Sequence, residues 1–270
     1  MQNLYLHEIW IYPVKSLAGI RLEKARVMGK GLQFDRRWML IDEAGVAMTQ
    51  RVYPLMALFK LNLHEGNIFI TFRKGKTTIS AAHFSIAAPP SDKWISARIW
   101  NDQVEVLEVD PKVSEWFSFH LGFTCRLVAF PEKKPRAVDP RYSIRHDQVS
   151  LADAYPFLII GQRSLDDLNS RLAEPVPMNR FRPNFVFSGG IPYAEDHFKE
   201  FSIGNIRFTA VKKCDRCVLT TVNQDSAEKG TEPLLTLSSY RKLDNKVYFG
   251  QNLLALDEGE VAVGDRVIPG

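Results

Sequence analysis

The sequence contains little cysteine and has no long apolar run. Its three cysteines, Cys125, Cys214 and Cys217, are too few to form a disulfide framework. Their odd number agrees with a reducing compartment. No run of about 18 apolar residues occurs, so we expect no membrane span. The apolar stretch 9–14 is too short for the core of a secretory signal, and no basic segment precedes it. We therefore expect a cytoplasmic, bacterial protein.

Neither sign of charge dominates, and the familiar phosphate loops are absent. The net charge of +4 is too small to indicate nucleic-acid binding. The sequence has no G-x-x-x-x-G-K-[ST] motif and no G-x-G-x-x-G after a strand. The basic residues are nevertheless concentrated in the segment 126–146, where six of them stand against two acidic residues and are mixed with prolines. This segment predicts a linker or long functional loop, and it is a possible docking surface for an acidic partner.

Short strands are the main predicted elements. Phe59, Leu61 and Leu63 alternate with polar residues, and a turn at 65–67 leads into 68–72, which predicts a hairpin. Residues 37–41 with the turn 42–45 predict a second hairpin. Further strands are expected at 157–160, 185–187, 203–211 and 261–267. Helices are expected at 114–121, ended by Gly122, and from the capping-box-like Ser164-x-x-Asp167, with Leu165, Leu168 and Leu172 buried. The chain is thus expected to be mainly β with some helices (α+β), in two β-rich units of about half the chain each.

The Cys214-x-x-Cys217 motif has three interpretations. A zinc site lacks further ligands, because only Cys125 remains and no two histidines have motif spacing. A thioredoxin-like dithiol should open a helix, whereas the β-branched run after Cys217 predicts a strand. The third interpretation is a pair of cysteines buried in a β core. Charged neighbours, Lys212 to Arg216, argue against burial, and the cations among them favour a thiolate.

Three other clusters place cations beside hydrogen-bonding residues, at 12–16, 31–38 and 179–184. The guanidinium fork of arginine suits phosphates and carboxylates, although each cluster alone is also typical of a surface turn. Pro183 restricts the residue before it, so we expect Arg182 to be extended. Asp153 ends a Ser150-x-x-Asp153 box, which is also compatible with a helix N-cap.

Four motifs in this order resemble the MOSC-domain molybdenum proteins: Tyr-Pro-Val-Lys-Ser (12–16), Gly-x-x-x-Asp-Arg (31–36), Phe-Arg-Pro-Asn (181–184) and Cys-x-x-Cys-x-x-Thr-Thr-Val (214–222). Within that family the resemblance is to the mitochondrial amidoxime reducing component and to bacterial reductases of N-hydroxylated compounds. It covers nearly the whole chain. The fold that it implies is an N-terminal MOSC-type β-barrel domain (1–125), the basic linker or loop (126–146) and a β-barrel MOSC domain (147–270).

The resemblance also implies roles for individual residues. Cys217 would be the metal ligand and a catalytic residue, with Cys214 a neighbour that binds no metal. Asp153 matches an acidic, catalytic position near the metal. The residues that would hold the pterin and phosphate of a molybdenum cofactor are Lys15, Ser16, Arg36, Arg182 and Asn184. A soft, dithiolene-bound metal favours a thiolate, and a phosphate favours cations, which agrees with these residue types.

The implied activity is a molybdenum cofactor-dependent reduction of small N-hydroxylated substrates, from N–OH to N–H and water. The sequence has no cysteine set of a ferredoxin-like domain, so we expect a separate electron-transfer protein and its reductase to supply electrons. One alternative is a sulfur-transfer or cofactor-carrier protein, related to pyridoxal phosphate-type sulfurases, in which Cys217 carries a persulfide. A non-enzymatic alternative is a β-rich module that binds an acidic partner through 126–146.

Overall fold

Strands are the main regular elements of the protein in a computed structural model that describes residues 3–88 and 91–270. Within these residues there are nineteen strands and three α-helices. The expected mainly β fold with some helices is therefore confirmed. No helix in the described ranges is long and apolar enough to cross a membrane.

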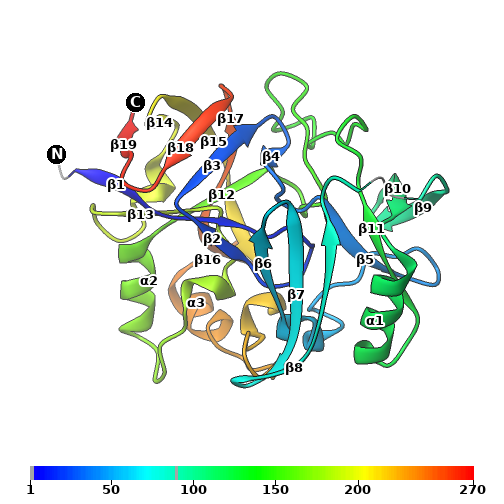
Figure 1. Ribbon diagram of the computed structural model, residues 1–270. Coiled ribbons are helices and arrows are strands. Elements are labelled where there is room, and N and C mark those ends of the chain that lie inside the picture. The colour runs from blue at the N-terminus through cyan, green and yellow to red at the C-terminus, as the bar shows by residue number, and fades with distance from the viewer. Residues whose placement is uncertain (1–2, 89–90) are drawn as a thin grey trace.

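A closed barrel forms the larger body, on the left in Figure 1. Its order is β12, β13, β1, β19, β14, β15 and β17, and the pairing of β17 with β12 closes it. The bounds are β1 (Leu4–Ile11), β12 (Phe157–Gly161), β13 (Phe185–Ser188), β14 (Glu200–Ile203), β15 (Ile206–Arg216), β17 (Lys246–Ala255) and β19 (Arg266–Pro269). The short strands β2 (Ile20–Leu22) and β16 (Lys242–Leu243) extend it at β1 and β17. Strand β1 pairs with β13 and β19, so the barrel contains the N-terminal strand.

Burial of alternate side chains explains the barrel. In β1, Leu4 and Leu6 face the core before a bulge, and Ile9 and Ile11 face it afterwards. A bulge inserts an extra residue and so shifts the side-chain alternation by one position. Phenylalanines at the centre of the barrel, among them Phe157, pack edge to face or stacked. The expected strands 157–160 and 185–187 are confirmed as β12 and β13.

The remaining strands form three smaller sheets. The first pairs β5 (Trp38–Asp42), β11 (Cys125–Ala129), β10 (Asp102–Glu108) and β9 (Trp94–Ile99), the second is the meander β6 (Phe59–His64), β7 (Asn67–Lys74) and β8 (Thr77–Ser85), and the third pairs β18 (Gly259–Ala262), β3 (Lys24–Met28) and β4 (Gly31–Leu32). The hairpin predicted from 58–72 is confirmed as β6 and β7. The second predicted hairpin is only half formed, because the chain after β5 returns to it through a single antiparallel bridge, between Ile41 and Ala47.

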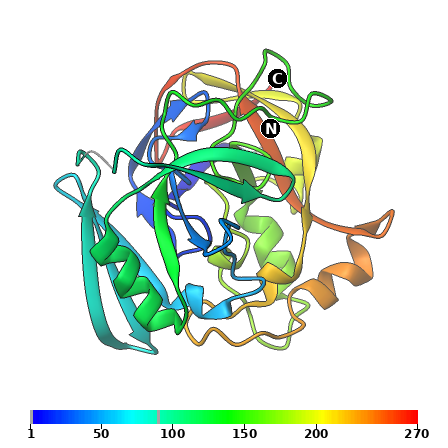
Figure 2. The same cartoon turned by 90° about the vertical axis from the view of Figure 1, so that its right-hand side faces the viewer.

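Three α-helices in the described ranges flank the sheets: α1 (Pro111–Leu121), α2 (Gln162–Asn169) and α3 (Leu234–Tyr240). Figure 2 shows α1, in green, beside the meander of β6 to β8, in cyan. Helix α1 begins where the Asp110 side chain accepts the Lys112 N–H and ends at Gly122, as predicted, which has a left-handed φ of 82°. Helix α2 begins two residues earlier than the expected box, so Ser164 is not its N-cap. The Ser164 hydroxyl instead donates to Glu195 Oε2 at 2.9 Å.

Three other local predictions are wrong. The single strand expected at 203–211 is split by a turn at Gly204, and the strand at 261–267 is split at Gly264. Both glycines have positive φ, 56° and 94°, a conformation that glycine adopts without strain and that ends a strand. The residues after Cys217 form a 3-10 helix, Val218–Thr221, and not a strand.

The basic segment 126–146 is packed against the body and is not a free linker. After β11, the chain from 130 to 156 has no strand, apart from a bridge between Ala137 and Gln148. Arg136 is buried, and its guanidinium pairs with Asp102 at 2.8 Å and donates to the carbonyl of Ser150 at 2.7 Å. The boundaries 1–125, 126–146 and 147–270 stay a prediction, since β1 lies in the barrel of the second half.

Candidate functional site

A cavity of about 430 Å³ is lined by residues from both halves of the chain. Every site residue expected from the sequence lines it: Lys15, Ser16, Arg36, Asp153, Arg182, Asn184 and Cys217. Their individual roles stay predictions. The sequence reasoning missed two further lining residues that contact this set, Arg51 and Trp100. Neither residue belongs to one of the sequence motifs. The signal that could have pointed to Trp100 is a bulky side chain in the short turn between two strands.

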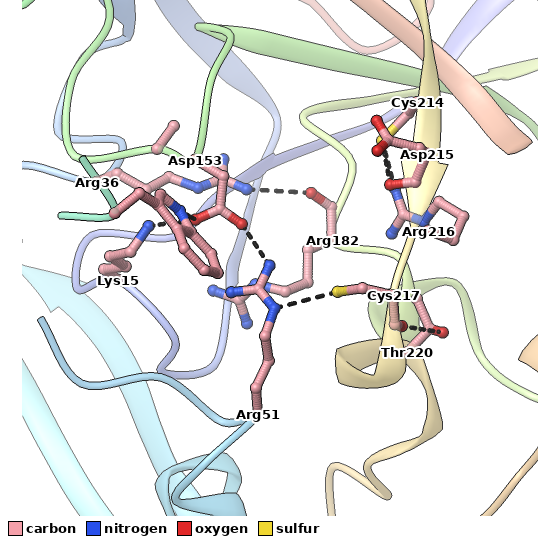
Figure 3. A network of polar contacts seen from close by, with 12 residues as sticks. Lys15, Arg36, Arg51, Asp153, Arg182, Cys214, Asp215, Arg216, Cys217 and Thr220 are labelled. Atoms are coloured by element: carbon pink, nitrogen blue, oxygen red, sulfur yellow. Dashed lines mark hydrogen bonds and ion pairs between the residues drawn. The ribbon is translucent and has the colours of Figure 1, made fainter. Parts of the chain in front are cut away.

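Asp153 is the centre of an ion-pair network (Figure 3). Its two carboxylate oxygens lie 2.5 Å from Lys15 Nζ and 2.6 Å from Arg51 Nη2. Loss of water at the cavity wall would raise the pKa of Asp153, but the charges of Lys15 and Arg51 outweigh it and hold that pKa well below its usual range. The carboxylate therefore stays ionised at neutral pH. No helix follows Ser150 directly, so the N-cap interpretation of this segment is wrong.

The Cys217 thiol faces the same network. Its Sγ accepts a hydrogen bond from Arg51 Nε at 3.1 Å, as Figure 3 shows. The Thr220 hydroxyl donates back to the Cys217 carbonyl at 2.9 Å and fixes the turn that presents the thiol. The described residues contain no group of three or more His, Cys, Asp or Glu side chains that could hold a metal.

Cys214 has a separate environment. Its Sγ accepts from Arg216 Nη1 at 2.9 Å, while burial raises the pKa of the Cys214 thiol more than Arg216 lowers it. No hydrogen bond between Cys214 and Cys217 is present in the described chain, and Cys217 opens a 3-10 helix of four residues, not an α-helix. These surroundings do not resemble those of a thioredoxin-like dithiol.

Arg182 and Arg36 both lie over the Tyr12 ring, at 4.2 Å and 4.3 Å from its centroid. Arg36 pairs with Asp35 at 2.6 Å. Arg182 is 8% exposed and, within the described residues, has no carboxylate at salt-bridge distance. Burial, aided by the charge of Arg36, lowers the pKa of Arg182 to about 10, so it is still protonated at neutral pH. A buried cation without a counter-charge is costly, which favours an anionic ligand at this place.

Four of the lining residues have strained backbones: Ser16, Arg36, Arg182 and Trp100, of which Trp100 has a φ of 55°. Ser16, Arg36 and Arg182 have φ values of 64°, 49° and 56°, in the left-handed region that residues with side chains seldom adopt. The extended conformation expected for Arg182 is therefore wrong. Arg36 Nη2 donates to the Arg182 carbonyl at 3.1 Å, which helps to hold the unusual turn. Strained residues of this kind cluster at functional sites, because the surrounding structure has to hold them.

Asn184 lines the cavity, but its side chain is already bonded to the backbone. Its Oδ1 accepts the Leu158 N–H at 3.2 Å, and its Nδ2 donates to the Trp10 carbonyl at 3.1 Å. These bonds tie β13 to β12 and β1, which implies that Asn184 shapes the wall of the cavity. Over the whole lining, six cationic side chains face three acidic ones. The surplus of positive charge suits an anionic ligand.

Comparison with known proteins shows two domains along this chain. Residues 146–268 match the MOSC domain, and residues 3–124 match the MOSC N-terminal beta barrel domain. The chain is 34% identical to mitochondrial amidoxime-reducing component 1 of Mus musculus, over 96% of this chain and 80% of that protein. This chain belongs to the MOSC-domain family. The family resemblance drawn from the four motifs is thereby confirmed.

The relatives of this chain are of two kinds. Molybdenum cofactor sulfurase of Oryza sativa subsp. japonica is 32% identical, over 100% of this chain and 36% of that protein. The human mitochondrial amidoxime-reducing component 1 is 34% identical, over 96% of this chain and 81% of that protein. The name of the first protein refers to the molybdenum cofactor, and the name of the second refers to amidoxime reduction.

Proposed function

We propose that this MOSC protein binds a molybdenum cofactor in the cavity and reduces N-hydroxylated compounds. The observation that carries the proposal is the placement of the Cys217 thiol and the buried Arg182 guanidinium on one cavity. A thiolate is the protein ligand that a soft, dithiolene-bound metal favours. A buried guanidinium with no carboxylate partner in the described chain favours a phosphate.

The residues present fit such a cofactor. Cys217 would hold the metal, and Arg182, Arg36, Lys15 and Ser16 would hold the phosphate-bearing pterin. A cavity of about 430 Å³ is within the usual size range of cofactor sites. The bound cofactor would supply the two-electron redox chemistry. In the overall reaction two electrons and two protons enter, the N–O bond breaks, an N–H bond forms and the oxygen leaves as water.

The protein's own residues would orient the reacting groups. Asp153 accepts from both Lys15 and Arg51 and so keeps the two cations at the cavity wall. Its lowered pKa means that Asp153 holds no proton to donate at neutral pH, so its catalytic role would be electrostatic and positional. Arg51 donates to both Asp153 and the Cys217 sulfur, which fixes the direction of the thiol.

The electrons would come from a separate redox partner. In the described part of the chain, no group of three or more His, Cys, Asp or Glu side chains could hold a metal centre for electron transfer. We place the protein in a system with a small electron-transfer protein and its reductase, acting in the bacterial cytoplasm.

Sulfur transfer is the second candidate function. The similarity to a molybdenum cofactor sulfurase over the full chain favours it, and a persulfide on Cys217 would keep the hydrogen bond from Arg51. Isotopic sulfur labelling separates the two functions, because stable label on Cys217 is expected only for a persulfide carrier.

The direct test combines metal analysis with turnover. We expect the purified protein to contain molybdenum and to reduce an amidoxime or a hydroxylamine with an artificial electron donor. Protein reconstituted with the cofactor but inactive on both compounds would refute the reductase assignment. Label retained on Cys217 in that sample would favour sulfur transfer.

A further inference from the structure

Trp100 stands at the tip of the β9–β10 hairpin and lines the cavity, yet its side chain is 55% exposed. Ile99 pairs with Asp102, so the turn has two central residues, Trp100 and Asn101. Trp100 has a φ of 55°, whereas Asn101 is not in the left-handed region. This is the pattern of a type II′ turn, which favours glycine at the position that Trp100 occupies. A bulky residue here is strained, and such strain is common at functional positions.

Two contacts hold the indole at the cavity. Its Nε1 donates to Asp153 Oδ1 at 3.3 Å, and the Arg51 guanidinium carbon lies 4.8 Å from a ring centroid. The same Arg51 donates to the Cys217 sulfur. Arg51 therefore connects the indole of Trp100 to the thiol of Cys217. More than half of the Trp100 surface is exposed and can contact a ligand.

Trp94 is a natural comparison within the same hairpin. It lies on β9, is 48% exposed and has Lys134 4.5 Å from its ring centroid. It does not line the cavity and has no positive φ. Exposure and a cation on the ring are thus shared by both tryptophans, while cavity position and backbone strain belong to Trp100.

We propose that Trp100 is a specificity residue whose open surface stacks on a planar aromatic body of the substrate. The N–OH group of that substrate would lie toward Cys217, so the inference rests on the proposed function for the reacting group. Aromatic pairs prefer offset stacking or edge contact, and one such pair is worth about two- to tenfold in affinity. The favoured substrate class is therefore aromatic N-hydroxylated compounds over aliphatic ones.

Benzamidoxime and acetamidoxime test this directly, because they share the reacting group and differ in the ring. Calorimetric binding to purified protein of known molybdenum content should show tighter binding of benzamidoxime. Trp100→Ala should weaken benzamidoxime binding about two- to tenfold and leave acetamidoxime binding unchanged. In turnover, KM for benzamidoxime should rise and kcat should change little. Trp100→Phe should retain much of the preference, and the control Trp94→Ala all of it.

Trp100→Gly separates a binding role from a structural one. Glycine relieves the left-handed strain, so Tm should stay the same or rise while the aromatic preference is lost as in Trp100→Ala. A lower Tm for Trp100→Gly together with an equal loss of affinity for both compounds would overturn the inference. Equal affinity of the wild type for the two compounds would also overturn it. A preference that survives in Trp100→Ala would also overturn it. Binding of benzamidoxime without reduction would refute the proposed reductase and leave the specificity role intact.

Discussion

Cys214 and Cys217 have different partners, and their substitution should have different effects. Cys217→Ser should abolish molybdenum-dependent reduction, because a hydroxyl is a far poorer ligand than a thiolate for a soft-ligated metal. Cys214→Ser should leave much of the activity, since that thiol accepts a hydrogen bond from Arg216 and packs against a hydrophobic cluster that includes Phe181. Molybdenum content and turnover should be measured on both variants. Equal loss in two folded variants would indicate a shared dithiol role.

Removal of the Arg182 charge should act on cofactor affinity. Arg182→Ala should lower molybdenum occupancy more than turnover per bound metal, because a charge-assisted bond is worth about 1.5–3 kcal/mol, or roughly ten- to a hundredfold in affinity. Arg163→Ala is the control, since Arg163 is an exposed arginine of α2 that does not line the cavity. Unchanged occupancy with slower turnover per metal would place Arg182 at the substrate instead.

The motifs predict residue positions better than conformations. Each of the four motifs contributes residues to one cavity, because each motif is short and places a cation or thiol near the end of a strand. The left-handed backbone of Arg182 was not predictable, because it depends on the distant Arg36 that donates to its carbonyl. Arg51 and Trp100 reach the site from turns that are far away in sequence, where no local pattern marks them.

At the scale of elements, a buried carboxyl joins α2 to the 3-10 helix Ala194–His197. Glu195 is fully buried, and its oxygens accept the Gly161 N–H at 3.2 Å and the Ser164 hydroxyl at 2.9 Å. Burial raises the pKa of Glu195 despite these hydrogen bonds. The folded state therefore binds a proton that the unfolded state has lost over the pH range between the two pKa values. The stabilising contribution is complete below the unfolded pKa and is lost as pH rises through the folded one.

Glu195→Gln should remove that pH dependence. Relative to the wild type, the variant should gain stability as pH rises from about 4.5, the ordinary pKa of this group, toward neutrality. Urea unfolding at pH 4 and pH 7 measures the change. Glu174→Gln, at an exposed position, is the control and should follow the wild type. Parallel profiles for Glu195→Gln and wild type would show that Glu195 does not titrate differently in the two states.

Strand periodicity predicts the elements more reliably than their ends. The hairpin at 59–72 was predictable because alternation and turn chemistry agree, and the strand at 157–160 because it is a short continuous apolar run. Two long strands were not, because Gly204 and Gly264 end them in the left-handed conformation. The apparent capping box at Ser164 failed for another reason, since its hydroxyl is taken by Glu195 from a different element.

At the scale of the whole molecule, the cavity exists only where the two halves meet. Lys15 and Arg51 from the first half bind Asp153 and Cys217 from the second, and Gln50 bonds Gln224 across the same junction. Strand β1 also belongs to the barrel that is otherwise built from the second half. Sequence order cannot reveal this junction, because the contacting residues are separated by about a hundred positions or more. We infer that the two halves fold as one unit around the site.

The approach of an electron donor also belongs to the whole molecule. Turnover with a reduced nicotinamide alone should be absent, and a small electron-transfer protein with its reductase should restore it. In the basic segment 126–146, Arg136 and Arg141 pair with Asp102 and Asp139, so not all of its charge is available to a partner. Lys133 is exposed and Lys134 half-buried, and these two are our candidates for the encounter surface.

Charge complementarity mainly accelerates encounter, and salt weakens it because exposed charges are screened beyond ~10 Å at 0.1 M ionic strength. The second-order rate with an acidic donor should therefore fall as salt rises. Lys133→Glu with Lys134→Glu should reduce that salt dependence and leave turnover with a small-molecule donor intact. The matched control reverses Lys74 and Lys76, two exposed lysines at the end of β7 and the following turn. An identical salt response in the Lys133/Lys134 variant and the wild type would exclude these lysines from the encounter, and turnover with nicotinamide alone would refute the need for a partner.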